Sequence, residues 1–216
     1  TLTDADTKGY LEQIPTMKNK IIKVPNAIPN LRSFEEMERN KDIIAAGRLV
    51  PQKGFDLLIE AAPKILQKHP DWKIKIFGKG RDEKYLKDLI NEHGLQGKVL
   101  LMGPSKEIEK EMAQGGIYVL SSRYEGFGMV IVEAMQMGLP VVSFDCPEGP
   151  REIIKDGYDG ILVANGDLDG LANSINMLIE NPQLREELAE NAKCRVKRFN
   201  MANIGSIWIE CLHKLY

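Results

Sequence analysis

Short apolar runs alternate with segments of helical periodicity from Lys41 onward, and this alternation limits the fold more than any other feature of the chain. DIIAAGRL (42–49) is typical of a buried strand, and FDLLIEAAPKILQKH (55–69) repeats its apolar residues at helical spacing. Further strands are expected at 72–78, 98–103, 116–122, 140–145 and 160–163, and further helices at 82–94, 106–114, 128–138 and 150–157. The tail from Asp167 predicts two or three helices, the first of which ends before Pro182.

Strand and helix in regular alternation predict an α/β fold, in which a parallel sheet has helices on both faces. In such a sheet, ligands bind in the loops at the carboxyl ends of the strands. The residues before the alternation differ, because a Pro/Asn cluster at 25–30 is typical of a linker and the polar stretch 31–41 is expected to be a surface excursion.

Composition excludes several classes of function. The 216 residues carry a net charge of -2, which gives no general attraction to nucleic acid or to anionic membranes. No apolar run approaches the roughly 18 residues of a spanning helix. The three cysteines form no metal-ligand pattern, and an odd number of them without a signal peptide favours a cytoplasmic location.

The loop GRLVPQKG (47–54) is the first candidate for chemistry. Arg48 closes a strand and Lys53 stands just before the next helix. Two cations beside a helix N-terminus can form an anion site. Two solvated surface charges are an equally fair interpretation of these residues alone.

The next two loops give weaker signals. FGKGRDE (77–83) lacks the third glycine of a dinucleotide fingerprint, so Gly78 and Gly80 indicate a tight turn that could bring backbone near a ligand. In MGPSKEIEKEM (102–112), Ser105 is expected to be a helix N-cap.

RYEGFGMVIVEAMQMG (123–138) is the most informative stretch. A helix that begins near Gly128 would offer free amide groups at Gly128, Met129 and Val130, and the glycines would let a phosphate approach them. Glu133 would follow about 7 Å along the axis, where its carboxylate could accept both hydroxyls of a ribose. Glu125, before the helix, could accept hydroxyls of a sugar beyond the diphosphate.

In order and spacing, GRLVPQKG, FGKG, LLMGPS, SSRYEGFGMVIVEAMQMGLPVVSFD and PREIIKDGYDGILV resemble the donor-binding half of glycosyltransferase family 4. These are retaining enzymes of the GT-B fold, in which two Rossmann-like domains face each other across a cleft. The resemblance implies that Arg48 and Lys53 hold the donor diphosphate, that Glu133 holds the ribose, and that Glu125 and its loop contact the transferred sugar. Arg48, Lys53 and Glu125 are therefore the expected catalytic residues. The expected substrate-binding residues are Gly78, Gly80, Ser105, Lys106, Gly126, Phe127, Gly128, Met129, Val130 and Glu133, with the main chain of 102–106 expected near the base.

The resemblance also implies a reaction and its partners. We expect transfer of a hexose from a nucleotide sugar, UDP in preference to GDP or ADP, to a glycan or glycolipid in polysaccharide biosynthesis. Fixed cations and amides that stabilise charge on the leaving phosphate would make a metal unnecessary, so no metal and no cofactor are expected. The Asp-Leu-Asp string at 167–169 is expected to cap the helix that follows it.

The sequence is expected to depart from the family's pattern in two respects, which concern the acceptor domain and a histidine of the cleft. Residues 1–28 would be the remaining edge of an acceptor domain with its linker, and 29–216 the donor domain. This piece alone would then be inactive, and any peripheral membrane contact would come from the missing half. The cleft histidine of many relatives would also be missing, because His69, His93 and His213 lie away from the four loops. A nucleotide-sugar 2-epimerase or phosphorylase half, or a non-catalytic nucleotide-binding module, remains an alternative.

Overall fold

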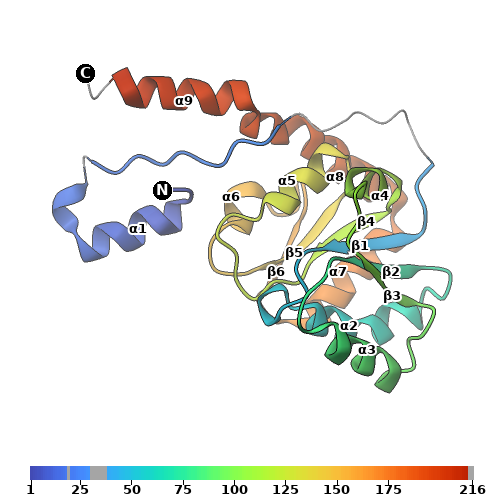
Figure 1. Ribbon diagram of the computed structural model, residues 1–216. Coiled ribbons are helices and arrows are strands. Elements are labelled where there is room, and N and C mark those ends of the chain that lie inside the picture. The colour runs from blue at the N-terminus through green and yellow to red at the C-terminus, as the bar shows by residue number, and fades with distance from the viewer. Residues whose placement is uncertain (19, 30–37, 214–216) are drawn as a thin grey trace.

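The computed structural model describes residues 1–18, 20–29 and 38–213, and its centre is a six-stranded sheet (Figure 1). Each pair of neighbouring strands is parallel. The strands are β1 (Asp42–Ala46), β2 (Lys73–Phe77), β3 (Val99–Gly103), β4 (Ile117–Leu120), β5 (Val141–Asp145) and β6 (Ile161–Ala164). The expected α/β fold is confirmed.

Helices cover both faces of this sheet. They are α2 (Phe55–Leu66), α3 (Glu83–Glu92), α4 (Ile108–Gln114), α5 (Met129–Gln136), α6 (Pro150–Ile153), α7 (Leu168–Glu180) and α8 (Pro182–Arg195). Alternate residues of β1 show the two layers, because Ile43 faces the core under α2, α3 and α7 while Ile44 faces the core under α4, α5 and α6. Both side chains are almost fully buried, as expected for a strand covered on both faces.

The strand order is β3-β2-β1-β4-β5-β6, so the chain reverses direction across the sheet between β1 and β4. The helices after these two strands leave toward opposite faces, and a crevice opens where they diverge. Ligands of such sheets bind in this crevice, at the carboxyl ends of the strands. The loops after β1 and β4 are the ones in which the sequence places Arg48, Lys53 and Glu125.

Local capping explains where several helices begin. The Asp167 carboxylate accepts the Gly170 amide and caps α7, as expected, and the Asn181 side chain caps α8 by accepting the Leu184 amide. The expected Ser105 cap is wrong: α4 begins only at Ile108, and the Ser105 hydroxyl instead accepts the Glu107 amide at 3.0 Å. The serine therefore closes the turn before the helix.

The two ends of the described chain lie together beside the sheet domain (Figure 1). Helix α1 (Asp4–Gln13), a 3-10 turn (Pro15–Met17) and an extended segment run back along α9 (Met201–His213). Val24 of the extended segment packs against Ile204 and Cys211 of α9. Of the polar stretch 31–41, residues 31–37 lie outside the described residues. Within the described part of the chain, no helix is both long enough and apolar enough to span a membrane.

Candidate functional site

A cavity of about 700 Å³ opens at the carboxyl ends of β1, β2, β3 and β4, and its volume is typical of a small-molecule site. The loops after these strands line it together with α5. Most of the predicted site residues meet here: Arg48, Lys53, Gly78, Ser105, Glu125, Gly126, Phe127, Gly128, Met129, Val130 and Glu133. Gly80 and Lys106 are not among its lining residues.

Hydrogen bonds fasten the loop after β4 to the loop after β1. The Arg123 guanidinium donates to both carboxylate oxygens of Asp56, at 2.8 and 2.6 Å, and to the Pro51 carbonyl at 2.7 Å. Gln52 donates its side-chain amide to the Tyr124 carbonyl at 3.0 Å. These bonds hold the segment that carries Lys53 in register with the segment that carries Glu125. We call the Arg123–Asp56 pair the loop clamp.

Lys53 and Glu125 form an ion pair inside the cavity. Lys53 Nζ lies 2.6 Å from Glu125 Oε1, and the Ser122 hydroxyl donates to the same oxygen at 2.6 Å. The two charged side chains are only 15% and 8% exposed, and Ser122 is fully buried. The cation expected to bind phosphate and the carboxylate expected to bind sugar therefore neutralise each other in the unliganded protein.

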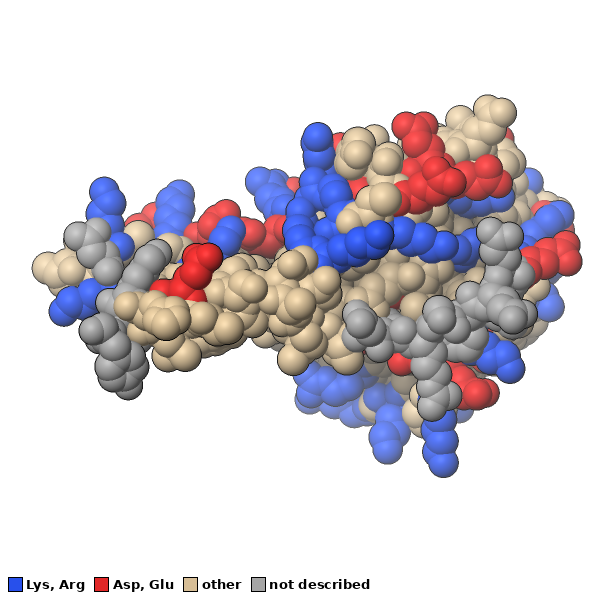
Figure 2. Space-filling view, turned by 90° about the horizontal axis from the view of Figure 1, so that it is seen from above, with Lys and Arg blue, Asp and Glu red and all other residues tan. Residues whose placement is uncertain are grey.

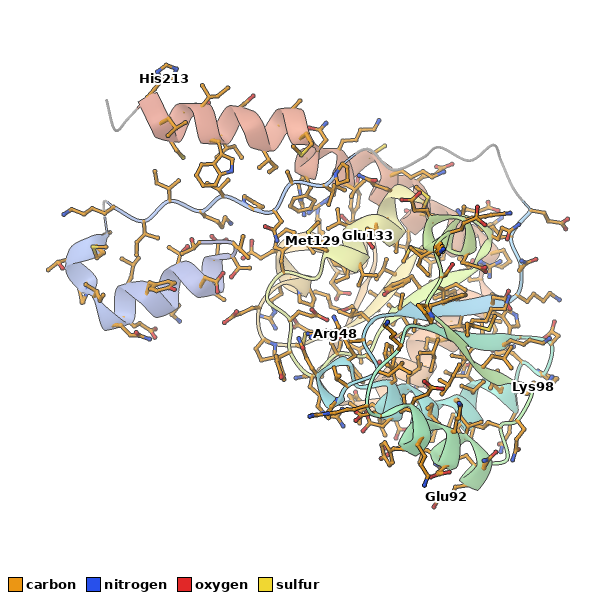
Figure 3. The ribbon with its side chains drawn as sticks, viewed as in Figure 1. Arg48, Glu92, Lys98, Met129, Glu133 and His213 are labelled. Atoms are coloured by element: carbon orange, nitrogen blue, oxygen red, sulfur yellow. The ribbon has the colours of Figure 1, made fainter. Side chains whose placement is uncertain are left out.

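Arg48 is in a different state. It is exposed at the end of β1, and its guanidinium has no ion pair or hydrogen bond to any residue that the structure describes. Figure 3 shows Arg48 in the loop after β1, below α5 in this view. Its charge is available to an incoming anion.

The Gly-Phe-Gly turn sets the start of α5. Phe127 is buried and packs edge-to-face on Phe199, with ring centroids 5.5 Å apart, which anchors the turn to the core. Gly128 has φ 93°, a left-handed conformation that suits glycine, and no side chain caps the helix there. Because the first amides of a helix have no intrahelical acceptor, the start of α5 presents free N–H groups to the cavity. A Cβ on Gly126 would meet only open space, so the glycine keeps that space clear.

Glu133 lies one turn further along α5 and also lines the cavity. Figure 3 shows Glu133 and Met129 on this helix. Partial burial raises the pKa of the Glu133 carboxyl, and the charge of Glu109 on α4 adds to the effect. A carboxylate kept in a partly dry site gains from ligand hydroxyls that can donate to it.

The second and third loops contribute mainly shape. A Cβ at Gly78 would lie 1.8 Å from the Gly47 carbonyl oxygen, and one at Gly80 would lie 2.2 Å from that of Leu49. Both glycines thus allow the loop after β2 to pack on the loop after β1, which is the structural role of Gly80. Ser105 borders the cavity, whereas Lys106 is exposed outside it.

Other residues considered in the sequence lie elsewhere. Asp169 pairs with Lys64 of α2, and Asp167 caps α7. The three histidines are not among the residues that line the cavity, and His213 lies at the far end of α9 (Figure 3). The loop after β5 lines a neighbouring cavity of about 500 Å³.

Comparisons with known proteins show the family and the fold of the chain. Residues 28–195 match the family described as glycosyl transferases group 1. The chain belongs to this family. Its fold is that of the C-terminal, Rossmann-like domain of a GT-B glycosyltransferase: the crystal structure of TarM from Staphylococcus aureus, a mutant in complex with fondaparinux, alpha-GlcNAc-glycerol and UDP, superposes with a TM-score of 0.90 at 28% identity. That match covers 97% of this chain and 42% of the TarM chain.

Two curated relatives of this glycosyltransferase domain carry names from polysaccharide chemistry. An exopolysaccharide phosphotransferase of Streptomyces coelicolor is 36% identical over 211 residues, which are 97% of this chain and 22% of that protein. The amylovoran biosynthesis glycosyltransferase AmsD of Erwinia amylovora is 34% identical over 198 residues, 88% of this chain and 55% of AmsD. The chain thus spans between about a fifth and about half of these relatives.

The sequence did not predict some of the residues at the cavity. The contacts of Ser122 and of the loop clamp depend on the loops after β1 and β4 lying side by side, which nothing local in the sequence indicates. Asn26, from the segment interpreted as a linker, and Lys79 also line the cavity. Lys79 could have been suspected from its place between two glycines, but nothing near Asn26 in the sequence signals a site.

Proposed function

We propose that this chain is the donor-binding domain of a retaining glycosyltransferase that transfers a hexose from UDP-sugar to a glycan or glycolipid acceptor. The observation that carries the proposal is the shared cavity, in which Arg48, the ion pair of Lys53 with Glu125, the free start of α5 and Glu133 all meet. Cations and amides suit the diphosphate, and the two carboxylates suit hydroxyls on either side of it.

The order of groups along α5 favours one orientation of the donor. A diphosphate at the amides of Met129 and Val130 would leave the ribose roughly 5–6 Å along the helix axis, beside Glu133. The sugar would then extend toward Glu125. Arg48 would approach the diphosphate from the loop after β1.

The same groups account for the chemistry of transfer. When the glycosidic bond to the β-phosphate breaks, negative charge builds on that phosphate. Arg48, Lys53 and the α5 amides would stabilise this charge more in the transition state than in the ground state, which is what catalysis requires. We therefore propose a reaction that needs neither a metal ion nor a cofactor.

Related proteins support the proposal of a UDP-sugar donor and of a role in polysaccharide synthesis. The TarM complex contains UDP and a GlcNAc-bearing compound, and AmsD is named for the synthesis of a polysaccharide. We propose that residues 29–216 bind the donor, that residues 1–28 belong to the edge and linker of an acceptor-binding domain, and that this second domain supplies the acceptor. The match to less than half of TarM agrees with such a division.

Calorimetric titration of the chain with UDP, GDP, ADP and their glucose conjugates, with and without a chelator, tests this function. We expect binding of the uridine nucleotides that the chelator leaves unchanged. Absence of binding to every nucleoside diphosphate, or binding only with a divalent metal, would overturn the proposal.

A further inference from the structure

The ion pair between Lys53 and Glu125 imposes a cost on any anion that uses Lys53. The ammonium is already within 2.6 Å of a carboxylate, and both side chains are largely buried. A phosphate that binds Lys53 competes with Glu125 for the charge of the ammonium and so weakens the ion pair. A buried carboxylate that loses its cation and gains no new partner is strongly destabilised.

A nucleoside diphosphate and a sugar nucleotide would offer different contacts to the Glu125 carboxylate in the proposed site. A nucleoside diphosphate brings negative charge close to Glu125 and offers it no donor at the sugar position. A sugar nucleotide brings the same diphosphate but adds hydroxyls, which can donate to the Glu125 carboxylate in place of Lys53. The Ser122 hydroxyl keeps the carboxylate aimed at this position in either case.

We propose that the Lys53–Glu125 ion pair makes the site select an intact sugar nucleotide over the nucleoside diphosphate left after transfer. Lys53 exchanges Glu125 for phosphate when the donor binds, and the sugar hydroxyls replace Lys53 on Glu125. After the sugar has gone, the carboxylate regains Lys53 and the nucleoside diphosphate is released. This inference rests on the proposed function, because it takes the cavity to be a nucleotide-sugar site.

The chain contains a matched ion pair that serves as a control. Lys75 Nζ lies 2.7 Å from Asp42 Oδ2, and these side chains are 22% and 10% exposed. Lys75 and Asp42 line a separate cavity that shares no lining residue with the proposed site. Loss of the Lys75–Asp42 ion pair should affect folding stability as loss of the Lys53–Glu125 pair does. It should not affect binding of the donor.

The test measures UDP, UDP-glucose and UDP-N-acetylglucosamine affinities for the wild type, Glu125→Gln and Asp42→Asn. Since Gln releases Lys53 and removes the nearby negative charge, we expect Glu125→Gln to bind UDP roughly tenfold more tightly and to lose its preference for the sugar nucleotides. Asp42→Asn should keep the wild-type affinities. Glu125→Asp, which retains the charge but shortens its reach to Lys53, should change UDP affinity in the same direction by less.

The outcomes separate this inference from the function on which it rests. If the wild type binds uridine nucleotides and neither variant of Glu125 binds UDP more tightly, the ion pair is a structural contact and the inference is wrong. If the wild type binds no nucleoside diphosphate, the proposed function fails and the inference fails with it.

Discussion

Arg48 and Lys53 carry the same charge into the cavity but start from different states. Arg48 has no side-chain partner among the described residues, whereas Lys53 is already paired with Glu125. Arg48→Ala should therefore weaken UDP binding by about 1.5–3 kcal/mol, the value of a charge-assisted hydrogen bond lost without replacement. Lys53→Ala should weaken it by less. Calorimetry checks both, with uridine as the ligand that neither variant should affect.

The control for Arg48 is Arg81→Ala, which removes an exposed guanidinium that does not line the cavity. This variant should bind UDP as the wild type does. Equal weakening of UDP and uridine by Arg48→Ala would contradict the assignment of Arg48 to the diphosphate.

Glu133→Gln should have one effect on nucleotide preference and a different effect on folding stability. Gln offers one acceptor oxygen where the carboxylate offers two, so the preference for UDP over 2′-deoxy-UDP should shrink. Burial raises the pKa of the Glu133 carboxyl. A carboxyl whose pKa is higher in the folded than in the unfolded protein lowers the free energy of unfolding at pH values above the folded pKa. Below the unfolded pKa it has no such effect. The variant should thus be more stable than the wild type at about pH 7, and this gain in folding stability should vanish at about pH 4.

Calorimetric unfolding at the two pH values, with nucleotide titration of the same samples, checks this prediction. An unchanged preference against the 2′-deoxy nucleotide would return Glu133 to the role of an ordinary helix residue.

At the scale of elements, the loop clamp should matter for both stability and binding. Arg123→Gln removes a bidentate pair between the loop after β4 and α2. Because the pair is partly exposed, we expect a loss of only about 1 kcal/mol of unfolding free energy. UDP affinity should fall as well, since the loops that carry Lys53 and Glu125 lose their register. Denaturant unfolding and calorimetry measure the two effects, and unchanged affinity would confine the clamp to stability.

The strands and helices of the sheet domain were predictable because each buries a continuous or periodic apolar set. The ends of these elements were less predictable. The expected Ser105 cap was wrong because α4 begins at Ile108, two residues later than a helix capped by Ser105 would begin. That the loops after β1 and β4 line the cavity was also predictable, because their glycines and charged residues are visible in the sequence. The contact of Lys53 with Glu125 was not, because residues 72 positions apart meet only through the strand order of the sheet.

At the scale of the whole molecule, α1 and α9 expose an apolar surface. Trp208, Ile209 and Leu212 of α9 are each more than half exposed, and so is Tyr10 of α1. Figure 2 shows the arm that contains α9 as mostly tan, while Lys and Arg side chains gather over the adjoining sheet domain. A second domain packed on this arm would cover the apolar side chains.

Transfer should depend on that second domain. It would orient the acceptor against the donor and exclude water, and orientation alone accounts for roughly 7–11 kcal/mol of a barrier. The 216-residue chain should therefore form no product even at saturating UDP-sugar, and adding the acceptor domain should restore transfer. An assay of product formation with and without that domain decides the matter, because transfer by this chain alone would contradict its description as a half-enzyme.

The central claim is that the crevice between β1 and β4 binds the diphosphate of a sugar nucleotide, and amide NMR spectra recorded during a titration with UDP-glucose test it most directly. The largest shifts should fall on the amides of Gly128, Met129 and Val130 and on the loop that carries Arg48, with uridine alone moving these signals far less. Shifts centred on another surface, or none at saturating ligand, would contradict the account.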